Sequence, residues 1–180
     1  MNKIQLHDKT FKLFIPYEKI MSTIDHVANE INKDFKDSKD IPILLCVLNG
    51  SIMFTSELMK RLNFNCELVA IKLSSYIGTD TTGEVKIAMN LTSNIQGRRV
   101  IVIEDIVDSG HTLIELDNII KQAGAADVKM CTMLLKPDAY KKDRKLDYVG
   151  LEIPNDFIVG FGLDYNELGR NLKDIYTLDV

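Results

Sequence analysis

The stretch Val100-Ile-Val-Ile-Glu-Asp-Ile-Val-Asp-Ser-Gly-His-Thr112 joins an apolar tetrapeptide, two adjacent carboxylates and a turn of small polar residues. Its first four residues are all β-branched, which favours a buried strand. We expect a turn over Asp105–Gly110 and a helix over Thr112–Ala123, which Gly124 would end. A turn that leads into a helix presents backbone N–H groups and the positive end of the helix dipole. Such a turn is suited to binding an anion.

The adjacent carboxylates Glu104 and Asp105 favour a functional site in this stretch. A routine helix cap by Asp108 or Ser109 would account for the turn alone. It would not account for two carboxylates packed against the end of an apolar strand, where they must be solvated, pair with a cation or accept hydrogen bonds. The hydroxyl groups of Ser109 and Thr112 add further donors to the anion cradle.

The flanking sequence predicts an α/β fold, a mainly parallel twisted sheet flanked by helices, because strands alternate with helices. The expected helices are Tyr17–Phe35, whose apolar residues have helical spacing, and Ile52–Leu62; the expected strands are Ile41–Leu48, Cys66–Ser74, Val85–Asn90, Val128–Leu135, Tyr148–Ile153 and Phe157–Phe161. In such sheets, ligands bind at the carboxyl ends of the strands. Asn49-Gly50, the polar loop from Ser75 to Gly83, Glu104–Thr112 and Lys136 each follow an expected strand, so we expect one shared crevice.

Composition excludes several classes of function. The chain has 180 residues, of which 46% are hydrophobic and 27% charged, as in one ordinary globular domain. Its net charge of −4, with both signs interleaved, argues against a nucleic acid partner. No apolar run reaches the ~20 residues of a membrane span, so we expect no membrane partner either. Three isolated cysteines and the lack of an apolar leader indicate a cytoplasmic protein with reduced thiols and no zinc site.

The stretch around Glu104 resembles the phosphoribosyl pyrophosphate signature of the type I phosphoribosyltransferases. It is most similar to the hypoxanthine-guanine branch, which reads Val-Glu-Asp-Ile-x-Asp-(Ser/Thr)-Gly. Leu48-Asn49-Gly50 is similar to the short pyrophosphate loop of the family, Ser75-Tyr76 to the start of its mobile lid, and Lys136 to its purine-reading lysine. The tail from Val149 to Arg170 resembles the family's base and pyrophosphate segment almost throughout. The resemblance therefore implies the type I phosphoribosyltransferase fold over 1–180, with a small hood from about 1–15 and 150–180.

The resemblance also implies catalytic roles. Glu104 and Asp105 would accept hydrogen bonds from the ribose hydroxyls and help to place Mg²⁺, and Asp164 would hold magnesium on the pyrophosphate side. Asp108 would act as general base on purine N7 while N9 attacks C1′. A closing Ser75-Tyr76 lid would keep water from an oxocarbenium-like ribose. The substrate-binding set would include the pyrophosphate loop and the 5′-phosphate segment: Asn49, Gly50, Ile106, Val107, Ser109, Gly110, His111 and Thr112.

The remaining implied contacts concern the base and the leaving group. Phe157 would stack on the purine, the backbone of Ile158 and Asp164 would contact it, and Lys136 would donate to its 6-oxo group. Such a donor favours hypoxanthine or guanine over adenine. Arg170, together with magnesium, would stabilise charge on departing pyrophosphate. Each residue also has a plain structural interpretation: Phe157 as core, Lys136 as a solvated loop lysine, and Asp164 with Arg170 as a surface pair.

Two departures from the family pattern predict weaker substrate binding. Many relatives carry lysine or arginine in place of Asn49, and lysine in place of His111. The implied activity is purine salvage, in which the 5-phosphoribosyl group moves from phosphoribosyl pyrophosphate to N9 of hypoxanthine or guanine, giving IMP or GMP and pyrophosphate. A homodimer or homotetramer is implied as well. A xanthine-accepting enzyme and a non-catalytic sensor of phosphoribosyl pyrophosphate stay open, although Asp108, the lid and Arg170 argue against the sensor.

Overall fold

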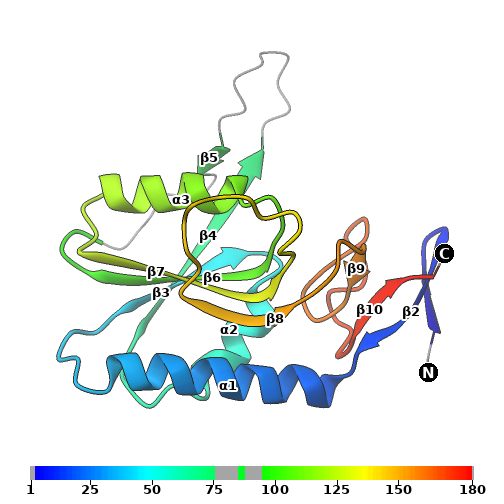
Figure 1. The fold of residues 1–180 in the computed structure, drawn as a ribbon, viewed down its shortest axis with the longest axis horizontal. Coiled ribbons are helices and arrows are strands. Elements are labelled where there is room, and N and C mark those ends of the chain that lie inside the picture. The colour runs from blue at the N-terminus through cyan, green and yellow to red at the C-terminus, as the bar shows by residue number, and fades with distance from the viewer. Residues whose placement is uncertain (1–2, 76–84, 88–94, 180) are drawn as a thin grey trace.

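A computed structural model describes residues 3–75, 85–87 and 95–179, and within these ranges the chain forms two β-sheets and three α-helices (Figure 1). The larger sheet has the strand order β5-β4-β3-β6-β7-β8. Its strands are β3 (Ile43–Leu48), β4 (Glu67–Ser75), β5 (Val85–Ile87), β6 (Arg99–Val107), β7 (Asp127–Leu135) and β8 (Tyr148–Glu152). All neighbouring pairs are parallel except β4 and β5. The predicted α/β class with a mainly parallel sheet is therefore confirmed.

Helices cover both faces of the larger sheet, which explains why its strands are apolar on both sides. Helices α1 (Tyr17–Phe35) and α2 (Ile52–Met59) pack on one face, and α3 (His111–Gln122) packs on the other (Figure 1). Alternate residues of the central strands serve the two faces. In β6, Ile101 and Ile103 join the core under α1 and α2, whereas Val100 and Val102 join the core under α3.

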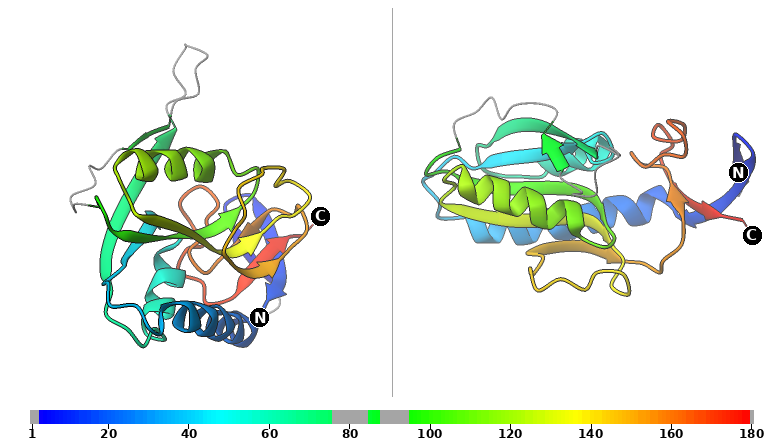
Figure 2. Two further views of the ribbon diagram at one scale, coloured as in Figure 1. Left: turned by 60° about the vertical axis from the view of Figure 1, so that its left-hand side comes forward. Right: turned by 90° about the horizontal axis from the view of Figure 1, so that it is seen from above.

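A second, antiparallel sheet brings the two ends of the chain together. Its order is β1-β2-β10-β9, with bounds β1 (Lys3–Leu6), β2 (Lys9–Ile15), β9 (Ile158–Val159) and β10 (Ile175–Leu178). The sheet has a small core of its own, made by Phe11, Val159 and Tyr176. Figures 1 and 2 show this sheet at one end of the molecule, beyond the carboxyl ends of the larger sheet, with both termini beside it.

The structure corrects one expectation at the decisive stretch. The turn predicted to begin at Asp105 is wrong, because β6 continues through Glu104 and Asp105 to Val107. Pairing with β7 holds this part extended, since Ile106 and Val107 lie opposite Leu134 and Leu135. Strands β1, β2 and β10 were not expected as strands, β9 is shorter than the predicted Phe157–Phe161, and residues 150–152 belong to β8 in the larger sheet.

No helix in the described ranges is both long and apolar enough to cross a membrane.

Candidate active site

The predicted polar segments gather at the carboxyl ends of parallel strands. Asn49 and Gly50 follow β3, Ser75 ends β4, residues 108–112 follow β6, and Lys136 follows β7. These four strands are neighbours in the order β4-β3-β6-β7, so the segments share one edge of the sheet. Tyr76 and the rest of the expected lid lie outside the described residues, and the prediction for this segment stays a prediction.

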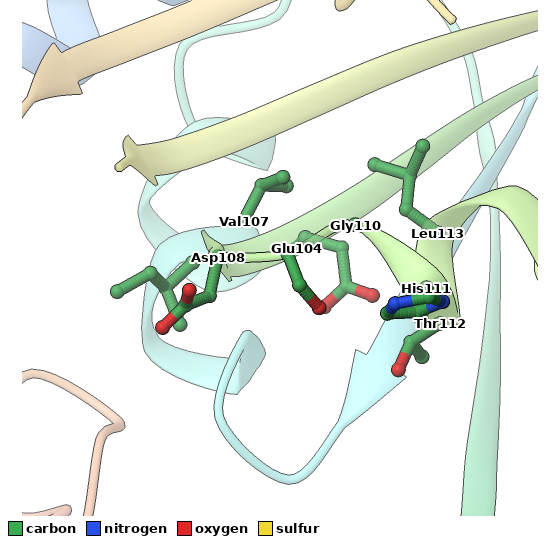
Figure 3. A pocket seen from close by; sticks show the side chains of 9 residues that line it. Glu104, Val107, Asp108, Gly110, His111, Thr112 and Leu113 are labelled. Atoms are coloured by element: carbon green, nitrogen blue, oxygen red, sulfur yellow. The ribbon is translucent and has the colours of Figure 1, made fainter. Parts of the chain in front are cut away.

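A pocket of about 130 Å³ lies between the end of β6 and the start of α3 (Figure 3). It is lined by Glu104, Ile106, Val107, Asp108, Ser109, Gly110, His111, Thr112 and Leu113. The first bond within α3 runs from the Ile114 N–H to the Gly110 carbonyl at 3.0 Å, so the N–H groups before Ile114 have no acceptor within the helix. The first turn, His111–Ile114, carries no acidic residue. The pocket therefore offers free donors and a positive dipole to an anion.

Gly110 makes the bend into the cradle possible. Its φ is +78°, in the left-handed region that glycine adopts at little cost. A β-carbon at Gly110 would lie 2.3 Å from Cε2 of Tyr140, so the Tyr140 ring packs directly against the backbone of the cradle. The Tyr140 hydroxyl donates to the carbonyl of Arg144. Sequence reasoning missed Tyr140, since it lies in the polar run after β7, where solvated side chains are the rule.

The paired carboxylates at the end of β6 are strongly desolvated. Burial, followed by the charge of Asp105, raises the pKa of Glu104 well above its ordinary value. Burial also raises the pKa of Asp105, although the Ile106 N–H, which donates to its Oδ1 at 2.8 Å, and the charge of Arg170 act in the opposite direction. An approaching cation would relieve the cost of both ionised groups.

Close backbone packing joins the loop after β3 to the loop after β9. A β-carbon on Gly50 would lie 1.5 Å from Oδ2 of Asp105, and one on Gly162 would lie 2.0 Å from the Gly50 carbonyl oxygen. The Leu48–Asn49 peptide bond in this loop is cis. Gly162 was not predicted as a site residue; the tail resemblance covered it, but periodicity says nothing of its contact with Gly50.

Arg170 is anchored at the same junction. Its Nη1 donates to the Gly162 carbonyl at 2.8 Å, and its Nη2 lies 2.7 Å from Oδ1 of Asp164. The other oxygen of Asp164 accepts a hydrogen bond from the Glu167 N–H at 2.8 Å. The sequence-predicted residues Gly50, Asp105, Asp164 and Arg170 are thus brought together.

The predicted base-reading lysine and the predicted general base form an ion pair. Nζ of Lys136 lies 2.9 Å from Oδ2 of Asp108. The backbone N–H of Lys136 also donates to the Val107 carbonyl at 2.9 Å, which fixes the start of the loop. Only 12% of the Lys136 side chain is exposed, against 56% for Asp108. Lys136 is therefore not the freely solvated lysine of the plain interpretation.

Phe157 and Ile158 lie in or beside the second sheet. Ile158 is buried in β9, whereas 46% of Phe157 is exposed. Phe157 is therefore not a core residue, which was its plain structural interpretation. Its ring contacts Phe11 and Tyr165, and sequence reasoning missed Tyr165 because nothing local marked it apart from its neighbour Asp164.

An anion cradle that follows one strand of a parallel sheet, with an acidic pair near the end of that strand, is typical of α/β proteins that bind phosphorylated ligands. Residues 16–166 match the model of the phosphoribosyl transferase domain, and the chain belongs to this family. The predicted family is confirmed.

Individual relatives share the hypoxanthine-guanine name. A hypoxanthine-guanine phosphoribosyltransferase of Streptococcus thermophilus (strain CNRZ 1066) is 41% identical over 168 residues, 93% of this chain and 92% of the relative. One from Bacillus subtilis (strain 168) is 38% identical over the same shares. A crystal structure of a hypoxanthine-guanine phosphoribosyltransferase from Bacillus anthracis matches with a TM-score of 0.86 and 37% identity, covering 93% of this chain and 98% of that one.

Proposed function

We propose that the protein is a purine-salvage enzyme that transfers the 5-phosphoribosyl group from phosphoribosyl pyrophosphate to N9 of hypoxanthine or guanine. The products would be IMP or GMP and pyrophosphate. The observation that carries the proposal is that the Glu104–Asp105 pair, of which Glu104 is buried, leads directly into the anion cradle of α3, in a chain whose relatives bear that enzyme's name.

Phosphoribosyl pyrophosphate would bind along the edge of the larger sheet. The free N–H groups and hydroxyls of residues 108–112 suit its 5′-phosphate. The carboxylates of Glu104 and Asp105 suit the two ribose hydroxyls, which are donors. Asn49, Gly50 and the guanidinium of Arg170 suit the pyrophosphate, with Arg170 already oriented by Gly162 and Asp164.

The Lys136–Asp108 pair matches one edge of a 6-oxopurine. Such a base presents O6 and N7 side by side, and the Lys136 ammonium and the Asp108 carboxylate lie 2.9 Å apart. Lys136 would donate to O6 while Asp108 accepts the N7 proton. As N9 forms its bond to C1′, the bond from C1′ to the pyrophosphate oxygen breaks, and the N7 proton passes to Asp108. Phe157 would stack on the face of the base.

The donor set fits Mg²⁺. Within the described residues no three His, Cys, Asp or Glu side chains gather closely enough to hold a metal by themselves. Mg²⁺ usually binds one or two carboxylates together with substrate phosphates and water, so this arrangement suits it. Glu104 and Asp105 would hold magnesium on the ribose side, where a cation would offset the burial that raises the pKa of both carboxyls. Asp164 would hold magnesium on the pyrophosphate side. When bound, magnesium supplies positive charge to the leaving pyrophosphate.

The test is a nucleotide-forming assay with phosphoribosyl pyrophosphate, Mg²⁺ and, separately, hypoxanthine, guanine, xanthine and adenine. We expect product from hypoxanthine or guanine, none without Mg²⁺, and a kcat lowered about 10²–10⁴-fold by Asp108→Asn, the usual range for removal of a general base. Product from xanthine alone would keep the chemistry and overturn the base assignment. Binding of phosphoribosyl pyrophosphate without any product would favour a non-catalytic sensor.

We also propose that the protein works in the cytoplasm as a homodimer or homotetramer. An apolar hollow of about 430 Å³ between α2, β3 and β4 supports the oligomer, and Ile52 and Leu68 at its rim are 47% and 52% exposed. The free thiols of Cys46, Cys66 and Cys131 suit a reducing compartment. Sedimentation of the wild type and of Leu68→Lys tests the oligomer. A wild-type monomer would overturn it.

A further inference from the structure

Phe157 meets its neighbours in an ordered way although it is nearly half exposed. Its ring centroid lies 5.8 Å from that of Tyr165, with the ring planes at 83°, an edge-to-face contact. The fully buried Phe11 lies 6.2 Å away on a tilted plane. Edge-to-face contacts favour one ring orientation over others. Tyr165 and Phe11 therefore restrict the plane of Phe157 while leaving part of its surface open.

Tyr165 is itself held by three consecutive residues at the tip of the β1–β2 hairpin. Its hydroxyl donates to Oδ1 of Asp8 at 2.8 Å. The His7 ring meets it edge-on, with centroids 5.7 Å apart, and the Lys9 ammonium lies 5.1 Å from its ring centroid. Nε2 of His7 also lies 3.1 Å from the carbonyl oxygen of Asn166, the next residue along the chain. The hairpin tip thus grips this segment at two adjacent residues.

The contacts of the hairpin tip with Tyr165 and Asn166 lie where they can affect substrate binding as well as stability. Residues 7–9 lie outside the part of the chain that matches the family model, which begins at residue 16. Tyr165 directly follows Asp164, which pairs with Arg170 at the candidate active site. The hairpin tip therefore acts on the segment that follows Asp164 and precedes Arg170, and Tyr165 in this segment also contacts Phe157, the residue suited to the base.

We propose that Tyr165 is a positioning residue for Phe157, and that Asp8 at the hairpin tip fixes Tyr165 for this task. The inference rests on the proposed function, in which Phe157 stacks on the purine. A stacking ring binds best when its plane is set before the base arrives, because less motion is then lost on binding. Without Tyr165 the Phe157 ring would turn more freely, and base binding would weaken while phosphoribosyl pyrophosphate binding would not.

Steady-state kinetics of Tyr165→Leu and Tyr165→Phe test the proposal. We expect Tyr165→Leu to raise the KM for hypoxanthine about tenfold, the upper range for an aromatic pair, and to leave the KM for phosphoribosyl pyrophosphate within about twofold. Tyr165→Phe keeps the edge contact and should raise the base KM only about two- to threefold. Equal changes in both KM values, or none in either, would overturn the proposal.

Asp8→Ala provides a second route with a matched control. Asp34→Ala also removes an exposed carboxylate that accepts a tyrosine hydroxyl, from Tyr148 at 2.7 Å, but on α1, away from the second sheet. We expect Asp8→Ala to raise the base KM about two- to fivefold and Asp34→Ala to leave it unchanged. An equal effect of both variants would point to general destabilisation and sink the idea.

The mobility of the ring at position 157 can also be measured without catalysis, so that the role of Tyr165 is tested independently of the proposed reaction. The sequence has no tryptophan, so Phe157→Trp introduces a single indole at the stacking position. We expect its fluorescence anisotropy to fall when Tyr165→Leu or Asp8→Ala is added, and not when Asp34→Ala is added. If the wild type makes no nucleotide, the proposed function fails, and an unchanged anisotropy would show independently that Tyr165 does not position this ring.

Discussion

Gly50 lies directly against the carboxylate of Asp105, because a β-carbon on Gly50 would stand 1.5 Å from Oδ2 and 2.5 Å from Cγ of that side chain. The backbone of the loop after β3 therefore forms one wall of the acidic site at the end of β6. Gly162 packs against the same loop, because a β-carbon on Gly162 would lie 2.0 Å from the Gly50 carbonyl oxygen. Gly50, Gly162 and Asp105 thus allow the loop after β3, the loop after β9 and the end of β6 to pack closely against one another.

Gly50→Ala should lower kcat/KM at least about 100-fold, because the methyl group must displace Asp105 or the loop, and misplacement of about 1 Å costs that much. Steady-state kinetics with phosphoribosyl pyrophosphate and hypoxanthine measure the loss. Gly97→Ala is the control, since a β-carbon there meets nothing within 4 Å. Its φ of +72° makes that variant less stable but should spare kinetics at low temperature. Near-normal activity of Gly50→Ala would contradict the contact.

Glu104→Gln should stabilise the metal-free protein at neutral and higher pH. The pKa of Glu104 is raised in the folded state, so between its ordinary value near 4.5 and the raised pKa the folded protein holds a proton that the unfolded chain has released. Stability contributed by this group therefore falls as pH rises through that window. Thermal unfolding should show a higher Tm for the variant than for the wild type at pH 8, and no difference near pH 4. Each kcal/mol gained in the free energy of unfolding corresponds to a rise in Tm of about 2–4 °C.

Glu152→Gln, at an exposed position on β8, is the matched control for that comparison and should leave Tm unchanged at both values of pH. A Glu104→Gln variant that is less stable than wild type at pH 8 would mean that the carboxylate has a stabilising partner in the folded protein.

Lys136→Met should weaken the choice of 6-oxopurines over adenine. The variant removes the donor for O6 and leaves Asp108 without the ammonium that lies 2.9 Å from it. We expect the kcat/KM for hypoxanthine to fall about 10²-fold or more while the value for adenine changes little, because O6 of the bound 6-oxopurine is left without its donor and adenine has no such acceptor. Competition assays with both bases measure the ratio. An unchanged ratio would remove Lys136 from base recognition.

Gly110→Ala should raise the KM for phosphoribosyl pyrophosphate about tenfold or more. The added methyl group would clash with the Tyr140 ring at 2.3 Å and place alanine at a φ of +78°, which costs about 1–2 kcal/mol. The double variant with Tyr140→Ala removes the clash and keeps the backbone strain. It should recover part of the affinity, measured by titration with inorganic phosphate. No recovery would show that strain alone explains the defect.

The sequence predicted the larger sheet well because its elements are strongly apolar and local. The apolar runs at Ile41–Leu48 and Val100–Ile103 and the helical spacing of Tyr17–Phe35 leave few alternatives. The expected crevice at the carboxyl ends of β3, β4, β6 and β7 followed from the rule for parallel sheets. The sequence alone therefore predicts that the site residues on these strand ends lie near one another.

The second sheet was harder to predict because its strands pair across almost the whole chain. Leu178 lies opposite Phe11, and Thr177 opposite Lys12, and neither segment carries a pattern that names its partner. The extension of β6 through Glu104 and Asp105 was missed for a similar reason, since carboxylates disfavour strands locally and only pairing with β7 overrides this preference. The contacts of Tyr140 with Gly110 and of Tyr165 with Phe157 join separate loops, and the spacing of apolar residues along the chain cannot predict them.

The strand order of the second sheet has a consequence for synthesis of the protein on the ribosome. Strand β10 lies between β2 and β9, so β9 has no partner in this sheet and β2 has only β1 until residues 175–178 have emerged. The larger sheet and its anion cradle end at residue 152 and can form earlier. The part of the molecule suited to a phosphate can therefore form before the surface suited to a base, which needs residues 175–178 for its pairing.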